Sequence, residues 1–155
     1  MTRITKKSVG KSEQYLNHKE KAQSLGEKAD CAVRAIAVAC NVPYETAHAK
    51  LCELGRRHGS ATHNTDIRSA ICELGGKVQE YSFKQYREMV AQYPGKHCMK
   101  QYITTHHPDR FPKVWKDGKI YLFFTRGHVL CIRDGVNHDW TRGRSMKVTH
   151  IWEIS

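Results

Sequence analysis

The sequence predicts a single α+β domain, with helices in the first two thirds of the chain and an antiparallel sheet in the last third. Apolar residues recur at helical spacing as far as about residue 92, whereas β-branched and aromatic runs separated by turns begin near residue 119. Helices followed by strands indicate an α+β rather than an alternating α/β architecture. A length of 155 residues suits one domain, and no internal repeat or interdomain linker is apparent.

Residues 1–28 differ in character from the rest of the chain. They are polar and rich in lysine, with only isolated apolar side chains. We expect a basic N-terminal arm here, extended or loosely helical. The domain itself is expected to span residues 29–155.

The segment from Ala29 to Cys40 is rich in alanine and almost fully apolar. A helix that is apolar on nearly every side is buried, so this segment predicts a central helix. Asp30 is a good N-cap, and Asn41 is a stop signal. Cys31 would then be the first residue of the central helix.

Shorter patterns predict the remaining elements. Pro43 opens a second helix that Gly55 closes, and a third helix over residues 65–74 stops at two glycines. Further elements are expected as a short strand at 77–81, a helix from 82 to about 92 and a short helix at 99–105. Strands are expected at 119–125, 128–133, 136–140 and 147–154, with Asp134-Gly135 as a two-residue hairpin turn.

Composition indicates the environment of the protein. No apolar run approaches the roughly 20 residues of a membrane span, and the N-terminus lacks the apolar stretch of a signal peptide. We therefore expect a cytoplasmic protein with no membrane partner, in which the six cysteines are free thiols. The formal net charge of +11 predicts weak attraction to polyanions at low salt.

Cys31 is the cysteine whose position suits chemistry. A thiol reacts as its thiolate, and the positive end of a helix favours that form. The backbone N–H of Cys31 would also point out of this end, where it could bind an oxyanion. Cys131, by contrast, would lie in the middle of a strand.

The base and its orienting acid are predicted from the last hairpin. With Asp134-Gly135 as the turn, Arg133 pairs with Val136, which places His128 and Asp139 on the same face and within reach of each other. An acid beside a histidine fixes its tautomer and stabilises the imidazolium. His138 would point to the other face, and Asn137 would lie farther along.

Four segments carry a resemblance to a known family. They read DCAVRAIA at 30–37, VPYE at 42–45, GHV at 127–129 and DGVNHDW at 134–140. Together they resemble the papain-like thiol peptidases, and they are similar to small uncharacterised phage and prophage proteins of that kind and to the bacteriocin-processing and related bacterial Cys-His-Asp peptidases. The resemblance covers roughly residues 29–140.

The resemblance implies a papain-like fold and a role for each site residue. Cys31 would be the nucleophile, His128 the general base and Asp139 its orienter, with Trp140 shielding the His–Asp pair from water. In such enzymes a glutamine about six residues before the cysteine usually completes the oxyanion hole.

Two positions depart from that family pattern. Leu25 stands at the place of the oxyanion-hole glutamine, and Gln23 is the nearest glutamine. Ala32 replaces the glycine that often follows the nucleophile. The second oxyanion donor is therefore not assigned.

No cofactor or metal site is predicted. The neighbouring pairs His97-Cys98 and His106-His107, with Asp109, lack the spacing of zinc ligand pairs, and adjacent ligands rarely face one ion. No glycine-rich phosphate loop of the Walker type is present.

Two classes of function remain open. The first is a thiol hydrolase, a cysteine peptidase or isopeptidase, or an acyl transferase acting on a polypeptide or acyl substrate through a Cys-His-Asp triad. The second is a basic binding protein without catalysis, which as a viral protein would act on nucleic acid or a host complex in the host cytoplasm. Clustered basic residues suit the second class and are found at Lys6-Lys7, Arg56-Arg57 and Arg142/Arg144/Lys147.

Overall fold

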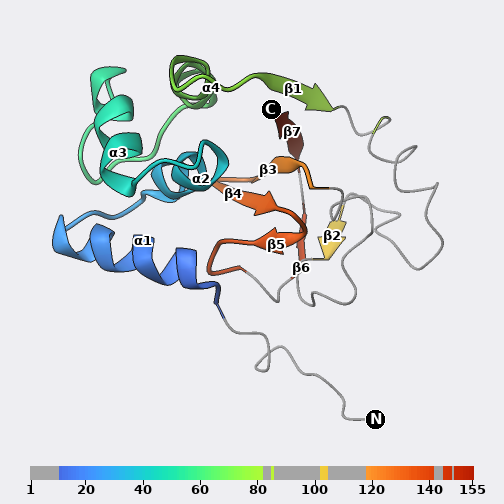
Figure 1. Ribbon diagram of the computed structural model, residues 1–155, viewed down its shortest axis with the longest axis horizontal. Coiled ribbons are helices and arrows are strands. Elements are labelled where there is room, and N and C mark those ends of the chain that lie inside the picture. Colours follow the sequence, from blue (N-terminus) through green and yellow to red (C-terminus); the bar gives the residue numbers. More distant parts are fainter. Residues whose placement is uncertain (1–10, 82–84, 86–101, 105–117, 142–144, 148) are drawn as a thin grey trace, which may run out of the picture.

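The computed structural model describes residues 11–81, 85, 102–104, 118–141, 145–147 and 149–155. It has the α+β composition that the sequence predicts, with helices preceding the main strands (Figure 1). The helices are α1 (Glu13–Ser24), α2 (Cys31–Ala39), α3 (Tyr44–Glu53) and α4 (Asn64–Glu73). The strands are β1 (Val78–Tyr81), β2 (Tyr102–Thr104), β3 (Ile120–Thr125), β4 (His128–Arg133), β5 (Val136–Asn137), β6 (Ser145–Lys147) and β7 (His150–Ile154).

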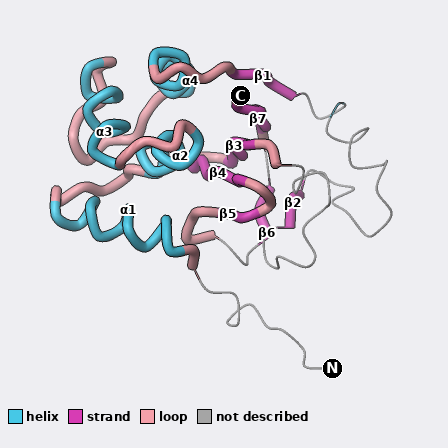
Figure 2. The backbone as a smooth tube through the Cα atoms, in the orientation of Figure 1, coloured by secondary structure: helices cyan, strands magenta, loops and turns pink. Residues whose placement is uncertain are grey.

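The main sheet has five antiparallel strands in the order β1-β7-β3-β4-β5. The C-terminal strand β7 lies between β1 and β3, so the end of the chain is inside the sheet (Figure 2). A separate antiparallel pair joins β2 to β6. The hairpin of β4 and β5 forms the opposite edge of the sheet from β1.

The core lies between the helices and one face of the sheet. Helix α2 is buried along almost its whole length and packs against β4 and β3. Val33 and Ile36 from α2 join Leu122, Cys131 and Trp152 from the sheet in one apolar cluster. Because the β-branched and aromatic run of β3 is buried on both faces, Tyr121, Phe123 and Phe124 are packing residues, as the neighbouring apolar positions indicate.

Helix α1 belongs to the packed fold. The Ser12 side chain caps it by accepting from the Tyr15 backbone N–H at 3.1 Å, and Tyr15, His18 and Ala22 are buried. The helix contacts α2 and α3. The basic arm expected over residues 1–28 therefore contains a packed helix, and residue 28 does not separate it from the domain.

The structure differs from the sequence-based expectation in three strands. The strand expected at 136–140 ends at Asn137, so His138, Asp139 and Trp140 follow β5 instead of lying within it. The short helix predicted at 99–105 is wrong, because residues 102–104 form β2. Ile103 and Thr104 are β-branched and favour a strand, and pairing with β6 supplies its hydrogen bonds. The single strand expected at 147–154 is divided between β6 and β7. The helix expected at 82–92 lies outside the described residues except for position 85.

None of the helices in the described part of the chain is long and apolar enough to cross a membrane.

Candidate functional site

Cys31 is the first residue of α2, as the sequence predicts, and its side chain is half-buried. The residue two positions before it, Ala29, has a φ of 52°, in the left-handed region that side chains disfavour. Such backbone strain persists only where surrounding contacts fix it, and it is often found at functional sites. The turn at Ala29 directs the chain into α2 with Cys31 at its positive end.

Asp30 is the N-cap residue of α2, as predicted, but its side chain makes no capping hydrogen bond to the helix backbone. Its Oδ2 instead accepts from the Nε of Arg34 at 2.9 Å and from the hydroxyl of Tyr44 at 2.8 Å. A buried carboxylate needs compensating donors, and these two provide them. The negative charge next to Cys31 is therefore paired with a guanidinium one helical turn away.

The hairpin that carries the proposed base has the predicted register. Arg133 pairs with Val136 and Ile132 with Asn137, on either side of the Asp134-Gly135 turn. Asp134 has a φ of 51°, which suits a tight two-residue turn. This register brings the two catalytic candidates on the hairpin together.

His128 and Asp139 form a direct contact. The His128 Nε2 lies 2.8 Å from the Asp139 Oδ2, and Asp139 is buried. Thr141 also donates to Oδ2, from its hydroxyl at 2.8 Å and its backbone N–H at 3.3 Å, and Asn137 donates to the Thr141 hydroxyl at 3.0 Å. Asn137 thus supports Asp139 indirectly, because it positions the Thr141 hydroxyl that donates to the carboxylate.

The remaining hairpin side chains tie it to the N-terminus of α1. His138 points away from His128, as predicted, and its Nδ1 lies 2.8 Å from the Ser12 Oγ. The Lys11 Nζ donates to the carbonyl of Trp140. The Trp140 ring lies 5.6 Å from the His128 ring, measured between centroids, so it covers one side of the imidazole while staying 42% exposed.

The electrostatics of the site favour a thiolate–imidazolium pair. Burial raises the pKa of Cys31, but hydrogen bonds from the His128 ring and the Val129 backbone N–H together lower it by more than burial raises it. The pKa of Cys31 therefore lies below its ordinary value. Burial lowers the pKa of His128, but Asp139 and the Cys31 sulfur raise it more, to about 10. Both shifts favour the state in which the imidazole carries the proton and the sulfur is a thiolate.

The other described thiols lack this environment. Burial raises the pKa of Cys40 to about 11 and raises the pKa of Cys131 still more. Cys52 and Cys72 are exposed on helices. Cys52 does lie 3.9 Å from the Nδ1 of His48, whose Nε2 contacts Glu27, but it is exposed on α3 and does not line the cleft. Among the five described cysteines, Cys31 is the one at a helix N-terminus beside a histidine–carboxylate pair in a cleft.

Two adjoining cavities open beside Cys31. One of about 330 Å³ is lined by residues that include Tyr15, Cys31, Arg34, His128 and Trp140. The other, of about 230 Å³, shares Cys31 and His128 but extends toward α4 and β3. The sulfur and the imidazole therefore lie where the two cavities meet, as in a cleft that an extended substrate could cross.

Sequence reasoning missed the contribution of α1 to this cleft. Gln23, the nearest glutamine to the expected oxyanion donor, is exposed near the end of α1, and its carbonyl accepts from the Gly26 backbone N–H. Tyr15 instead lines the cleft from the same helix. A buried tyrosine at helical spacing in a polar segment was the available signal, but it does not indicate which element the helix packs against.

Several other sequence candidates do not contribute to this cleft or are not described. The side chain of Arg56 is buried in an ion pair with Glu27, so it is not part of a basic surface. The pairs at 97–98 and 106–107, with position 109, lie outside the described residues, as do Lys6-Lys7, Arg142 and Arg144.

No family model, curated protein or solved structure matches the chain.

Proposed function

We propose that the protein is a thiol hydrolase, a cysteine peptidase or isopeptidase, that acts through Cys31, His128 and Asp139. The observation that carries the proposal is the meeting of a helix N-terminal thiol with a carboxylate-bound imidazole in one cleft. This arrangement contains a nucleophile, a base and a group that orients the base. The papain-like fold that the sequence motifs resemble is part of the same proposal.

The proposed mechanism begins with the ion pair already formed. The Cys31 thiolate attacks a carbonyl carbon, and the resulting oxyanion is bound by the Cys31 backbone N–H at the positive end of α2. The protonated His128 then donates its proton to the leaving group, which yields an acyl-enzyme. Water, activated by the same imidazole, hydrolyses the thioester, and Asp139 holds the ring in one tautomer throughout.

The cleft supports a polypeptide or acyl substrate. Apolar and aromatic side chains line it on both sides of Cys31, including Trp140 in the first cavity and Phe124 in the second. Because a cleft on each side of the sulfur accommodates a chain that continues in both directions, peptide and isopeptide bonds fit it well. Acyl transfer uses the same thioester, with an amine or thiol replacing water, and remains within the proposal.

The experiment is labelling with a set of peptide vinyl sulfones, which alkylate an active thiolate held in a substrate cleft. We expect covalent addition at Cys31 that is lost in Cys31→Ser and slowed in His128→Ala. Cys52→Ser, which removes an exposed thiol outside the cleft, should label like the wild type. Labelling spread evenly over the exposed cysteines, or an inert Cys31, would contradict the proposal.

The net charge favours a second candidate, a basic protein that binds polyanions. The surplus of lysine and arginine gives +11, which attracts nucleic acid without specifying a sequence. This candidate requires no thiolate. The reactivity of the Cys31 thiol therefore distinguishes the two candidate functions.

A further inference from the structure

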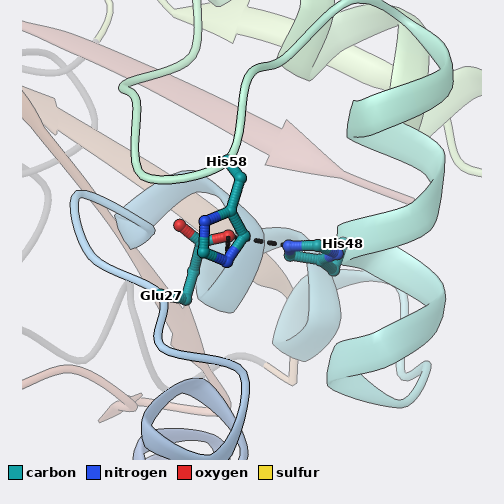
Figure 3. Close-up of side chains that lie close together, drawn as sticks. All are labelled: Glu27, His48 and His58. Carbon is teal, nitrogen blue, oxygen red and sulfur yellow. Dashed lines mark hydrogen bonds and ion pairs between the residues drawn. The ribbon is translucent and has the colours of Figure 1, made fainter.

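A second cluster of side chains lies among the helices and outside the residues that line the cleft. Figure 3 shows Glu27, from the loop between α1 and α2, together with His48 of α3 and His58 of the loop between α3 and α4. The Glu27 Oε2 lies 2.7 Å from the His48 Nε2 and 3.5 Å from the His58 Nε2. The three donor atoms all lie within 4.8 Å of one another.

These separations suit one metal ion. Zinc binds imidazole nitrogen and carboxylate oxygen at about 2.0–2.2 Å, so two ligands of a tetrahedral ion lie about 3.3 Å apart. The two measured carboxylate–imidazole distances lie on either side of that value. Small side-chain rotations would therefore place all three donors around an ion.

The carboxylate of Glu27 is held in place by groups outside the three donors. Arg56 donates from Nη1 to Oε2 and from Nη2 to Oε1, each at 3.0 Å, and the Gly59 backbone N–H donates to Oε1 at 2.6 Å. The side chains of Glu27 and Arg56 are fully buried. Fixed carboxylates of this kind orient metal ligands, and their supporting partners tune the affinity.

Arg56 limits how tightly a cation can bind. Its guanidinium neutralises part of the charge on Glu27, so the affinity should be lower than that of a site with a free carboxylate. It occupies one lone pair on each carboxylate oxygen, however, and a carboxylate offers about four. The remaining lone pair of Oε2 faces the His48 Nε2, and the His58 Nε2 lies 3.0 Å from the carbonyl oxygen of Leu25, so a bound ion would replace both of these contacts.

The chemistry of the donors selects the ion. Two imidazoles and one carboxylate suit a borderline cation such as Zn²⁺ better than the hard cations Mg²⁺ and Ca²⁺. The His58 side chain is 54% exposed, so the site has an entry path and room for water as a fourth ligand. We propose that Glu27, His48 and His58 bind Zn²⁺.

The test titrates Zn²⁺ against a chromophoric chelator in the Cys31→Ser protein, which removes the thiol of the cleft as a competing ligand. We expect one Zn²⁺ for each chain. His58→Gln should weaken binding at least about tenfold, since loss of even an outer partner costs about 10- to 100-fold. His63→Gln removes an exposed histidine at the start of α4 and should bind Zn²⁺ like its parent.

Co²⁺ spectra identify the ligands independently. Bound Co²⁺ should show no thiolate charge-transfer band in the parent, and its ligand-field spectrum should be lost in His48→Gln and His58→Gln. Folding of the variants is checked by thermal melting in EDTA. The proposal is overturned if no Zn²⁺ binds, if His58→Gln and His63→Gln bind it equally, or if Co²⁺ shows thiolate coordination. It does not depend on the activity of Cys31.

Discussion

At the scale of single residues, Asp139 shows what a short sequence can specify. A two-residue turn fixes the pairing of Ile132 with Asn137, and from that register the sequence predicts Asp139 near His128, which the structure bears out. Asp139 itself follows the end of β5, and Thr141 holds its carboxylate there. The hydrogen-bond partners of the Asp30 carboxylate could not be predicted in this way, because Tyr44 comes within reach of it only in the folded chain. Local rules succeed where the partners are close in sequence and fail where tertiary contacts decide.

The orienting role of Asp139 gives the first prediction. Asp139→Asn keeps the side-chain shape but removes the negative charge that stabilises the imidazolium, so vinyl sulfone labelling of Cys31 should slow by about 10²- to 10⁴-fold. Asp134→Asn is the matched control, because Asp134 is exposed at the turn of the same hairpin and asparagine accepts its positive φ. Equal labelling rates in the two variants would remove Asp139 from the mechanism.

At the scale of elements, the loop before α2 is held by long-range contacts. Glu27 receives hydrogen bonds from Arg56 and Gly59, while the His58 Nε2 lies 3.0 Å from the carbonyl oxygen of Leu25. These contacts join the loop that leads to Cys31 to the loop between α3 and α4. Neither loop has a periodic pattern, which is why the sequence did not reveal that they pack together.

Breaking the buried pair should therefore destabilise the fold. Glu27→Gln leaves the guanidinium of Arg56 buried without its counter-charge, and removing one partner of a buried pair costs about 3–5 kcal/mol. The measurement is the free energy of unfolding in urea with EDTA present. The exposed residue Glu53, paired with Lys50 on α3, supplies the control, since Glu53→Gln should change stability by less than about 1 kcal/mol. A similarly small loss of stability in Glu27→Gln would contradict the stabilising role of the buried Glu27–Arg56 pair.

At the scale of the whole molecule, the fold class was predictable but the topology was not. The switch from helical spacing to alternating strands gave α+β, and α2 is the buried central helix that its composition predicts. The insertion of β7 between β1 and β3 depends on pairing between distant segments. Such long-range pairings determine the strand order, and local sequence patterns do not show which strands pair with each other.

The charge of the whole molecule predicts weak, salt-sensitive binding to polyanions. The formal net charge is +11, although Arg56 is buried and does not contribute its charge to the surface. Affinity for duplex DNA should fall steeply as salt rises and should not depend on sequence. The measurement is the slope of log affinity against log salt for two unrelated duplexes. Tight binding to one duplex that persists at high salt would favour the nucleic-acid function instead.

The most direct test of the central claim is the pH dependence of Cys31 alkylation by iodoacetamide. The wild-type thiol should react at acidic to neutral pH, because His128 and Val129 lower the pKa of Cys31. In His128→Ala the profile should move upward to about 8.5 or above, since burial then acts without the imidazolium. The Cys52 peptide from the same digest serves as an internal reference, because Cys52 is an exposed thiol on α3 outside the cleft. Identical Cys31 profiles in the two proteins, or a Cys31 that stays inert in the native state, would contradict an activated nucleophile.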